Sequence, residues 1–361
     1  MNATAKLHTL GQSLWLDNIT RDMLNDGTLA GYIDALSVTG LTSNPTIFDH
    51  AVGKSSTYDS AIRDKLGAAE STEQLFFDLA LEDLGRAADL FRPIHERTNG
   101  VDGYVSLEVS PLLAYDTAST LAAAKDLHAR AARPNLLIKI PGTEEGLPAI
   151  EEAIFAGIPI NVTLLFSREQ YVAAAQAYHR GIARRIAAGL DPDIASVASI
   201  FISRWDVAVK DVVPEALHNK LGIAIGKRIY KAYQDLLASP DWQRVNNFGA
   251  RPQRLLWAST GTKDPNAPDT LYIEQLASPF TVNTMPEGTL NAFGDHGEVG
   301  ASLPQDGGDG EEVLAAFAKA GVDIDALAAR LQDEGAKSFV KSWHDLIGVI
   351  EAKSSEIKKA S

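Results

Sequence analysis

One lysine, Lys139, stands in the middle of an apolar stretch, NLLIKIPGTEEG, where Leu137 and Ile138 precede it and Ile140 follows it. Burying an ammonium group is costly unless the group is paired or loses its proton. Burial also lowers the pKa of lysines in general, which leaves part of the population as the free amine near neutral pH. A free amine in a dry pocket attacks carbonyl carbons and forms a Schiff base that can act as an electron sink. The stretch therefore indicates Schiff-base chemistry at Lys139.

Carboxylates and amides that could assist such a lysine stand in other strand-like stretches. Successive residues of a strand point to opposite faces. VSLEVS therefore turns Glu108 away from its valine and leucine face, and INVTLLFS turns Asn161 and Thr163 away from its apolar face. Asp17 follows the apolar LWL, and Asn44 ends ALSVTGLTSN. We expect these polar groups to converge near the C-terminal ends of their strands.

Together with Lys139, these carboxylates and amides are the kinds of side chain that cleavage of a carbon–carbon bond needs. Breaking the bond beta to an imine requires a base on the departing hydroxyl. Asp17 and Glu108 are the candidates for that base, either directly or through a water held by Thr163. Asn44 and Asn161 could hydrogen-bond the hydroxyls of a polyol chain.

Each group also has a purely structural interpretation. Asp17 could simply begin a loop, and Asn44 before Pro45 is a good turn former. Glu108 and Lys139 could form a buried structural ion pair. Only the convergence of several such groups favours the catalytic interpretation.

Lys210, in WDVAVKDVV, also has apolar neighbours and serves as a comparison. Asp206 lies four residues earlier, which predicts an exposed ion pair on a helix. Lys139 has no such partner within its own stretch.

Two cations follow later strand-like stretches. SIFISRWD places Arg204 just past the sixth stretch, and ASTGTK places Lys263 just past the seventh. With the backbone N–H groups around Gly261, they would suit a phosphate monoester. Taken singly, either residue fits a solvated surface cation equally well.

Composition and motifs argue against several other classes of function. The net charge of −14 disfavours nucleic acid and anionic membranes as partners. The chain has no cysteine, its eight histidines lack zinc-binding spacing, and no GxSxG elbow or complete phosphate loop is present. We therefore expect no metal and no cofactor. The sequence shows no signal-peptide core and no stretch of about 18 apolar residues, so we expect a cytoplasmic protein.

Eight strand-like stretches alternate with helical patterns along the chain. The stretches are 14–18, 35–44, 103–110, 135–140, 159–167, 194–203, 254–260 and 280–284. This alternation predicts a closed, parallel (β/α)8 TIM barrel, whose active site lies at the C-terminal ends of its strands. A doubly wound open sheet is the alternative, but no GxGxxG follows the first strand.

Three regions fall outside this repeat. Residues 46–100 hold more helix than one crossover needs, and the Gly- and Asp-rich stretch 287–310 predicts a loop. We predict a single domain with a barrel core at about residues 12–293. An acidic, Gly-rich loop at 294–310 and a helical C-terminal extension at 311–361 follow it.

These motifs, in this order over residues 14–293, make the chain similar to the transaldolases, and in particular to their longer bacterial branch. The resemblance is carried by LWLDN, LTSNPTIF, SLEVSPLLAYDT, LLIKIPGTEEG, NVTLLFS, SIFISRWD and WASTGTK. It implies a class I aldolase-type barrel in which Lys139 forms the Schiff base with a dihydroxyacetone unit.

The resemblance also implies roles for the other residues. Asp17 resembles the general acid/base of the family, and Glu108 and Thr163 resemble the pair that holds the catalytic water. Arg204 resembles a phosphate ligand, and Lys263 stands where many relatives have a second arginine. The residues that would surround the substrate are Asn44, Asn161, Ser199, Phe201, Arg204 and Lys263.

What the resemblance implies is a transferase of the non-oxidative pentose phosphate pathway, acting on sugar phosphates as a monomer or homodimer. It would move dihydroxyacetone from sedoheptulose 7-phosphate or fructose 6-phosphate to glyceraldehyde 3-phosphate or erythrose 4-phosphate. Two alternatives stay open. An aldolase that releases free dihydroxyacetone is disfavoured, because the small aldolases of the family carry tyrosine where this chain has Glu108. A non-catalytic sugar-phosphate-binding barrel is disfavoured because Lys139, Asp17 and Glu108 are all present.

Overall fold

The computed structural model of this 361-residue chain describes residues 2–360. In this part of the chain, eight parallel strands close into a barrel in sequence order, and β8 completes it by pairing with β1. The strands are β1 Ser13–Leu16, β2 Val38–Leu41, β3 Val105–Glu108, β4 Leu136–Pro141, β5 Ile160–Leu165, β6 Ser196–Phe201, β7 Arg254–Ala258 and β8 Val282–Met285. The predicted (β/α)8 barrel is confirmed.

Helices separate the strands and cover the outside of the barrel. The α-helices are α1 Ala3–Leu10, α2 Arg21–Asn25, α3 Thr28–Leu36, α4 Pro45–Lys54, α5 Asp59–Lys65, α6 Thr72–Arg97, α7 Thr117–Ala131, α8 Gly146–Phe155, α9 Arg168–Ala187, α10 Ser203–Val209, α11 Leu221–Ala238, α12 Pro240–Asn246, α13 Leu271–Gln275, α14 Glu287–His296, α15 Gly310–Lys319 and α16 Ile324–Ala360. Short 3₁₀ helices lie at η1 Ser56–Tyr58, η2 Pro111–Leu113 and η3 Glu215–Leu217. The extra helix expected between the second and third strands is confirmed as α4, α5 and α6.

β4 shows how the sequence sets a strand inside such a barrel. All six of its residues are buried, which is typical of parallel strands covered on both faces. Leu136, Ile138 and Ile140 belong to the hydrophobic core. Lys139 alternates with them and pairs in register with Glu108 of β3 and Asn161 of β5.

Two local predictions are wrong. Residues 287–296 form α14 rather than the start of a loop. Asp206 is buried and does not pair with Lys210, which instead lies 3.4 Å from Asp264. Asp206 accepts hydrogen bonds from the backbone N–H groups of Leu221 and Gly222. The unsatisfied N–H groups at the start of α11 therefore compete successfully for this carboxylate.

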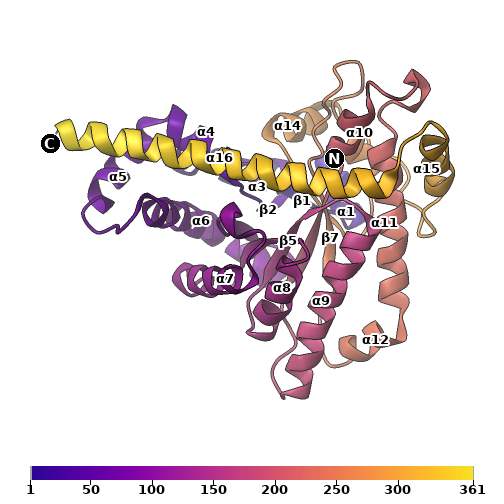
Figure 1. The fold of residues 1–361 in the computed structure, drawn as a ribbon, viewed down its shortest axis with the longest axis horizontal. Coiled ribbons are helices and arrows are strands. Elements are labelled where there is room, and N and C mark those ends of the chain that lie inside the picture. Colours follow the sequence, from indigo (N-terminus) through magenta and orange to yellow (C-terminus); the bar gives the residue numbers. More distant parts are fainter. Residues whose placement is uncertain (1, 361) are drawn as a thin grey trace.

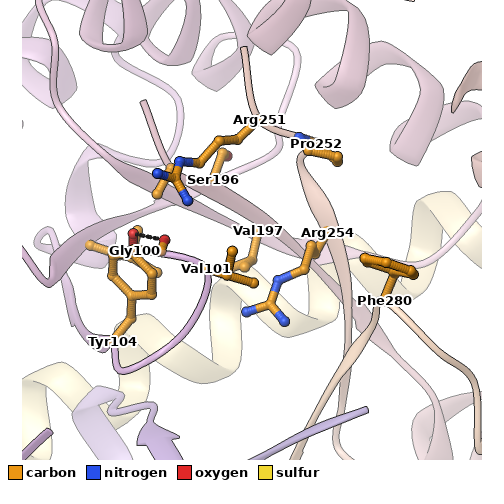
Figure 2. A pocket seen from close by; sticks show the side chains of 11 residues that line it. Gly100, Val101, Tyr104, Ser196, Val197, Arg251, Pro252, Arg254 and Phe280 are labelled. Carbon is orange, nitrogen blue, oxygen red and sulfur yellow. Dashed lines mark hydrogen bonds between the residues drawn. The ribbon is translucent and has the colours of Figure 1, made fainter. Parts of the chain in front are cut away.

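Apolar and polar side chains line the N-terminal end of the barrel. A cavity of about 110 Å³ there has Val101, Val197, Arg254 and Phe280 in its wall (Figure 2).

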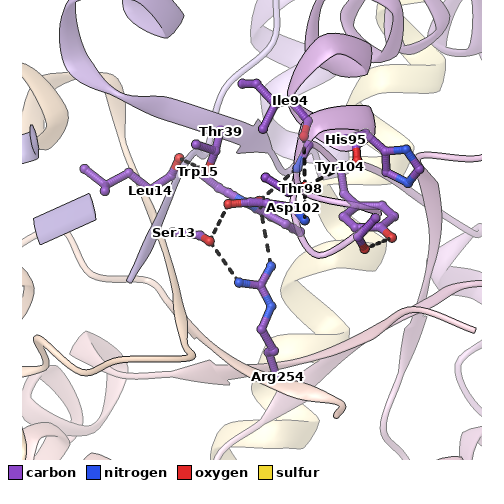
Figure 3. A network of polar contacts seen from close by, with 12 residues as sticks. Ser13, Leu14, Trp15, Thr39, Ile94, His95, Thr98, Asp102, Tyr104 and Arg254 are labelled. Atoms are coloured by element: carbon purple, nitrogen blue, oxygen red, sulfur yellow. Dashed lines mark hydrogen bonds and ion pairs between the residues drawn. The ribbon is translucent and has the colours of Figure 1, made fainter. Parts of the chain in front are cut away.

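Beside this cavity, a buried polar network crosses the barrel floor (Figure 3). Asp102 accepts hydrogen bonds from Trp15 Nε1 at 2.9 Å and from Ser13, and Arg254 donates to Ser13 Oγ at 2.9 Å. Polar groups at this end of a TIM barrel serve stability rather than chemistry.

The opposite, C-terminal end of the barrel is crossed by α16, the long yellow helix of Figure 1. Gln332 Nε2 donates to the backbone carbonyls of Gly142 at 3.1 Å and Leu164 at 2.9 Å. Gly142 directly follows β4, and Leu164 is the last residue but one of β5. Farther along α16, Trp343 packs edge-on against Phe76 of α6. The C-terminal helix is therefore attached both to the barrel mouth and to the helices before β3.

Within residues 2–360, none of the helices combines the length and the hydropathy that crossing a lipid bilayer requires.

Candidate active site

Lys139 lies near the C-terminal end of β4 and is 5% exposed. Its Nζ is 3.0 Å from Glu108 Oε2 and donates to the backbone carbonyl of Ser43 at 3.2 Å. The register explains the ion pair, because Glu108 of β3 stands directly beside Lys139. The lysine that the sequence singles out is therefore buried, and a carboxylate within hydrogen-bonding distance can take its proton.

Glu108 is buried, and its contact with Lys139 involves only one of its two carboxylate oxygens. Its Oε1 has no hydrogen-bond partner among the described residues. Burial raises the pKa of the Glu108 carboxyl, although the neighbouring Lys139 opposes the rise, and the charge of Asp17 adds to it. A carboxyl of this kind can exchange a proton at a pH nearer neutrality than an ordinary glutamate.

Asp17 directly follows β1 and lines the same cavity as Lys139. Its Oδ1 accepts a hydrogen bond from Thr42 Oγ1 at 2.8 Å, and Thr42 in turn contacts Thr284 Oγ1 at 2.6 Å. Asp17 keeps some accessible surface within the cavity, yet the surrounding protein screens it from bulk water. Burial therefore raises the pKa of Asp17, against the lowering effects of Lys139, Thr42 and Lys263. The raised pKa suits a group that alternates between general acid and general base.

The polar residues of β5 and β6 hold one another in place. Asn161 Nδ2 donates to Ser106 Oγ at 3.1 Å, and Ser199 Oγ donates to Asn161 Oδ1 at 2.7 Å. These contacts fix the orientation of the Asn161 amide beside Lys139. Thr163, two residues farther along β5, is buried, and its Oγ1 has no hydrogen-bond partner among the described residues.

Asn44 has a structural role as well as a place at the site. It is the N-cap of α4, where its Oδ1 accepts a hydrogen bond from the backbone N–H of Ile47 at 3.1 Å, and Pro45 follows as the first helical residue. The cap occupies the amide oxygen and leaves the Nδ2 donor for a ligand.

The two predicted phosphate ligands lie in the same cavity. Arg204, near the start of α10, has no hydrogen-bond or ion-pair partner in the described part of the chain, and the same holds for Lys263 beyond β7. Burial lowers the pKa of the Arg204 guanidinium. Its Cζ lies 5.1 Å from the centre of the Phe201 ring. Arg204 is partly buried, stacks on a ring and has no ion pair among the described residues, although the charge of Glu334 acts on it. A cation in this position is well prepared for an anionic ligand.

Together these groups line a cavity of about 130 Å³ at the C-terminal ends of the strands, hereafter the substrate cavity. Seven of the ten predicted site residues contribute to its wall, namely Asp17, Asn44, Lys139, Ser199, Phe201, Arg204 and Lys263. The other three, Glu108, Asn161 and Thr163, are buried on the strands beside Lys139.

The structure also shows lining residues that sequence reasoning missed. Thr42 and Thr284 support Asp17, and a polar residue at the end of a strand is the only signal that could have indicated them. Phe339 lines the substrate cavity from α16, far beyond the last strand, and nothing in the sequence marks it.

A wider cleft of about 690 Å³ lies at the N-terminal end of the barrel, around His95, His128 and Arg251. The described residues that line it include two carboxylates, Glu96 and Asp193, but no lysine. Although the substrate cavity is smaller than this cleft, it is the better candidate for the catalytic site. Among residues 2–360, no three histidine, aspartate or glutamate side chains gather in an arrangement that could hold a metal ion.

The arrangement brings a nucleophilic amine, two carboxyl groups of raised pKa and a cationic end into one cavity. It can form an imine with a ketone, exchange protons at neighbouring oxygens and hold a phosphate some distance away.

Comparison with known proteins agrees with this chemistry. The family model described as Transaldolase/Fructose-6-phosphate aldolase matches residues 14–350. The chain is similar to a transaldolase of Frankia alni, with 44% identity over 97% of this chain and 96% of that protein. It is also similar to a transaldolase of Thiobacillus denitrificans, with 45% identity over 97% of this chain and 100% of the relative. A protein named Transaldolase 2 from Nostoc sp. is 38% identical over 98% of each chain.

Proposed function

The chain belongs to the transaldolase/fructose-6-phosphate aldolase family, and from this premise we propose that it is a transaldolase. The reaction reversibly transfers dihydroxyacetone from sedoheptulose 7-phosphate or fructose 6-phosphate to glyceraldehyde 3-phosphate or erythrose 4-phosphate, as in the pentose phosphate pathway. The observation that carries this proposal is Lys139 Nζ, 3.0 Å from Glu108 at the end of β4, in a cavity that also holds Asp17 and Arg204.

The first step is formation of the imine. Arg204 and Lys263 bind the phosphate of the ketose and place its carbonyl carbon near Lys139. Glu108 takes a proton from the Lys139 ammonium, and the free amine attacks the carbonyl carbon. The carbon–nitrogen bond forms, and the carbonyl oxygen takes two protons that were first on the Lys139 ammonium, one of them returned by Glu108. The oxygen then leaves as water, and the iminium remains.

The second step breaks the carbon–carbon bond. Asp17 takes the proton of the hydroxyl on the far side of that bond, and the bond's electron pair moves into the iminium to give an enamine. The aldose phosphate then departs. The acceptor aldehyde reacts by the reverse of this step, and Asp17 returns the proton to the new hydroxyl.

The last step releases the product by hydrolysis of the new imine. Glu108 Oε1 and Thr163 Oγ1 are both buried without a hydrogen-bond partner in the described chain, which supports their holding the attacking water. In this proposal, Asn44 and Asn161 hydrogen-bond hydroxyls of the three-carbon unit. These roles form part of the proposal.

We further propose that the chain is one domain that acts as a monomer or homodimer. Every group in the mechanism comes from a single chain, and α16 is attached to the barrel mouth through Gln332. Light scattering coupled to gel filtration measures the oligomeric state directly.

Trapping the imine tests the proposal. The protein is incubated with fructose 6-phosphate and borohydride, and the adduct is located by mass spectrometry. A three-carbon adduct on Lys139 is expected, and a folded protein with no adduct at this residue would overturn the Schiff-base mechanism. Measuring free dihydroxyacetone with and without erythrose 4-phosphate then separates a transferase from an aldolase.

A further inference from the structure

Phe339 is the one residue in the wall of the substrate cavity that comes from α16, among the residues the structure describes. The other lining residues lie on barrel strands or in the segments that directly follow them. Phe339 is 5% exposed, so its ring is enclosed between the helix and the cavity.

The Phe339 ring contacts both charged ends of the substrate cavity. Its centre lies 5.6 Å from Lys139 Nζ and 5.9 Å from Arg204 Cζ. The Phe201 ring lies 5.1 Å from the same guanidinium and 6.4 Å from the Phe339 ring, at an interplanar angle of 63°. Arg204 therefore rests against two aromatic rings, one from the barrel and one from the C-terminal helix.

α16 lies very close to the barrel near Phe339. Gln332, Gly335 and Phe339 follow at helical spacing and share one face of α16. Gln332 binds two carbonyls at the barrel mouth. A Cβ atom at Gly335 would lie 2.9 Å from Leu164 Cδ2 and 3.2 Å from Arg204 Nη1, so the helix backbone lies almost against these side chains.

We propose that Phe339 is a specificity-determining residue of this site, an inference that rests on the proposed transaldolase function. The ring holds Arg204 in the orientation that binds the substrate phosphate. It also covers the Lys139 amine, and with it the enamine that forms there.

Covering the enamine decides which reaction follows. In transfer, the enamine carbon bonds to the aldehyde carbon of the acceptor, and the aldehyde oxygen takes a proton. In leakage, the enamine carbon takes a proton from water, a second water adds to the iminium carbon, and the carbon–nitrogen bond breaks to release dihydroxyacetone and the free amine. An apolar wall that excludes bulk water slows leakage without hindering the bound aldehyde.

Two substitutions separate the two roles of the ring. Phe339→Ala removes both the π face and the apolar bulk. It should raise the KM for fructose 6-phosphate about tenfold, because the cation–π contact is lost. It should also raise the ratio of released dihydroxyacetone to transferred product severalfold. Phe339→Leu keeps apolar bulk, so it should raise the KM while leaving this ratio near that of the wild type.

Ile350→Ala provides the matched control. Ile350 is fully buried on α16 but lies about 16 Å farther along the helix axis, beyond the substrate cavity. This variant loosens the helix and should change neither the KM nor the ratio. Circular dichroism and thermal unfolding establish that each variant is folded, and the leucine variant carries the test if the alanine variant unfolds.

Two results would overturn the inference. One is a folded Phe339→Ala protein with wild-type KM and wild-type ratio, and the other is an Ile350→Ala protein that shifts both quantities as much as Phe339→Ala. Absence of the Lys139 adduct in the wild-type protein would instead overturn the proposed function, so the two failures are distinguishable.

Discussion

Two glycines of α16 provide a sharp test of how closely this helix is fitted to the barrel. Gly348 is exposed, and a Cβ atom there would meet nothing within 4 Å. Gly348→Ala should therefore stabilise the protein by about 1 kcal/mol, the ordinary preference of a helix interior for alanine over glycine. The Gly348→Ala variant therefore measures how much a glycine-to-alanine change stabilises α16 when the new side chain meets no steric clash.

Gly335→Ala gains the same helix preference for alanine, but we expect it to destabilise the protein. The added Cβ lies 2.9 Å from Leu164 Cδ2 and 3.2 Å from Arg204 Nη1. Leu164 is 1% exposed and has a φ of +58°, so it has little freedom to move away. Overpacking of this kind costs about 1–3 kcal/mol, which exceeds the helical gain. We expect a net loss of about 1 kcal/mol and a raised KM for phosphorylated substrates, because Arg204 must shift.

Thermal and urea unfolding of the two variants measure the difference. For a chain of this length the melting temperature moves by about 1 °C per kcal/mol, so the two variants should shift in opposite directions. Steady-state kinetics with fructose 6-phosphate give the KM. If Gly335→Ala is as stabilising as Gly348→Ala and leaves the KM unchanged, then α16 is not closely fitted to the barrel mouth and the argument fails.

Three further predictions concern the substrate cavity. Lys139→Met should remain folded by circular dichroism but form no borohydride-trapped adduct and show no turnover; an adduct would contradict its role as nucleophile. Because burial raises the pKa of folded Asp17, its charged form weakens the fold as pH rises through that pKa. Asp17→Asn should thus be more stable than the wild type at neutral pH, and urea unfolding should show this advantage vanishing below about pH 4. Arg204→Ala should raise the KM for fructose 6-phosphate by about 10–100-fold, and Lys263→Ala by less; equal KM values for the wild type and Arg204→Ala would exclude Arg204 as the phosphate ligand.

The fold was predictable because each barrel strand carries its own signal. A strand buried on both faces is a short apolar run, and the helices between such runs have a different period. The two-residue period also fixed which face Lys139 and Glu108 share, and the register places them side by side. The convergence of polar groups was therefore predictable without knowing any distance.

The remaining features depend on which segments meet in space, and local patterns do not encode that. Asp206 looked like the partner of Lys210, but the start of α11 offers it backbone donors. Asn44 looked like a turn former or a ligand, and it caps α4 while facing the substrate cavity. Phe339 belongs to an amphipathic helix whose apolar residues all predict packing, so only the path of α16 across the barrel shows that one of them reaches the substrate cavity.

The contact between Glu108 and Lys139 could still be taken as a structural ion pair, and its surroundings argue otherwise. A buried pair stabilises a protein only when further hydrogen bonds satisfy both partners, and Glu108 Oε1 has none among the described residues. Asp17 places a second carboxylate near the pair, and its charge raises the pKa of Glu108 further. Two carboxyl groups and one ammonium beside an accessible cavity stabilise the folded protein less than apolar side chains of the same volume would. Such an arrangement is expected where proton transfer matters more than stability, and pKa values shifted by burial are typical of such sites.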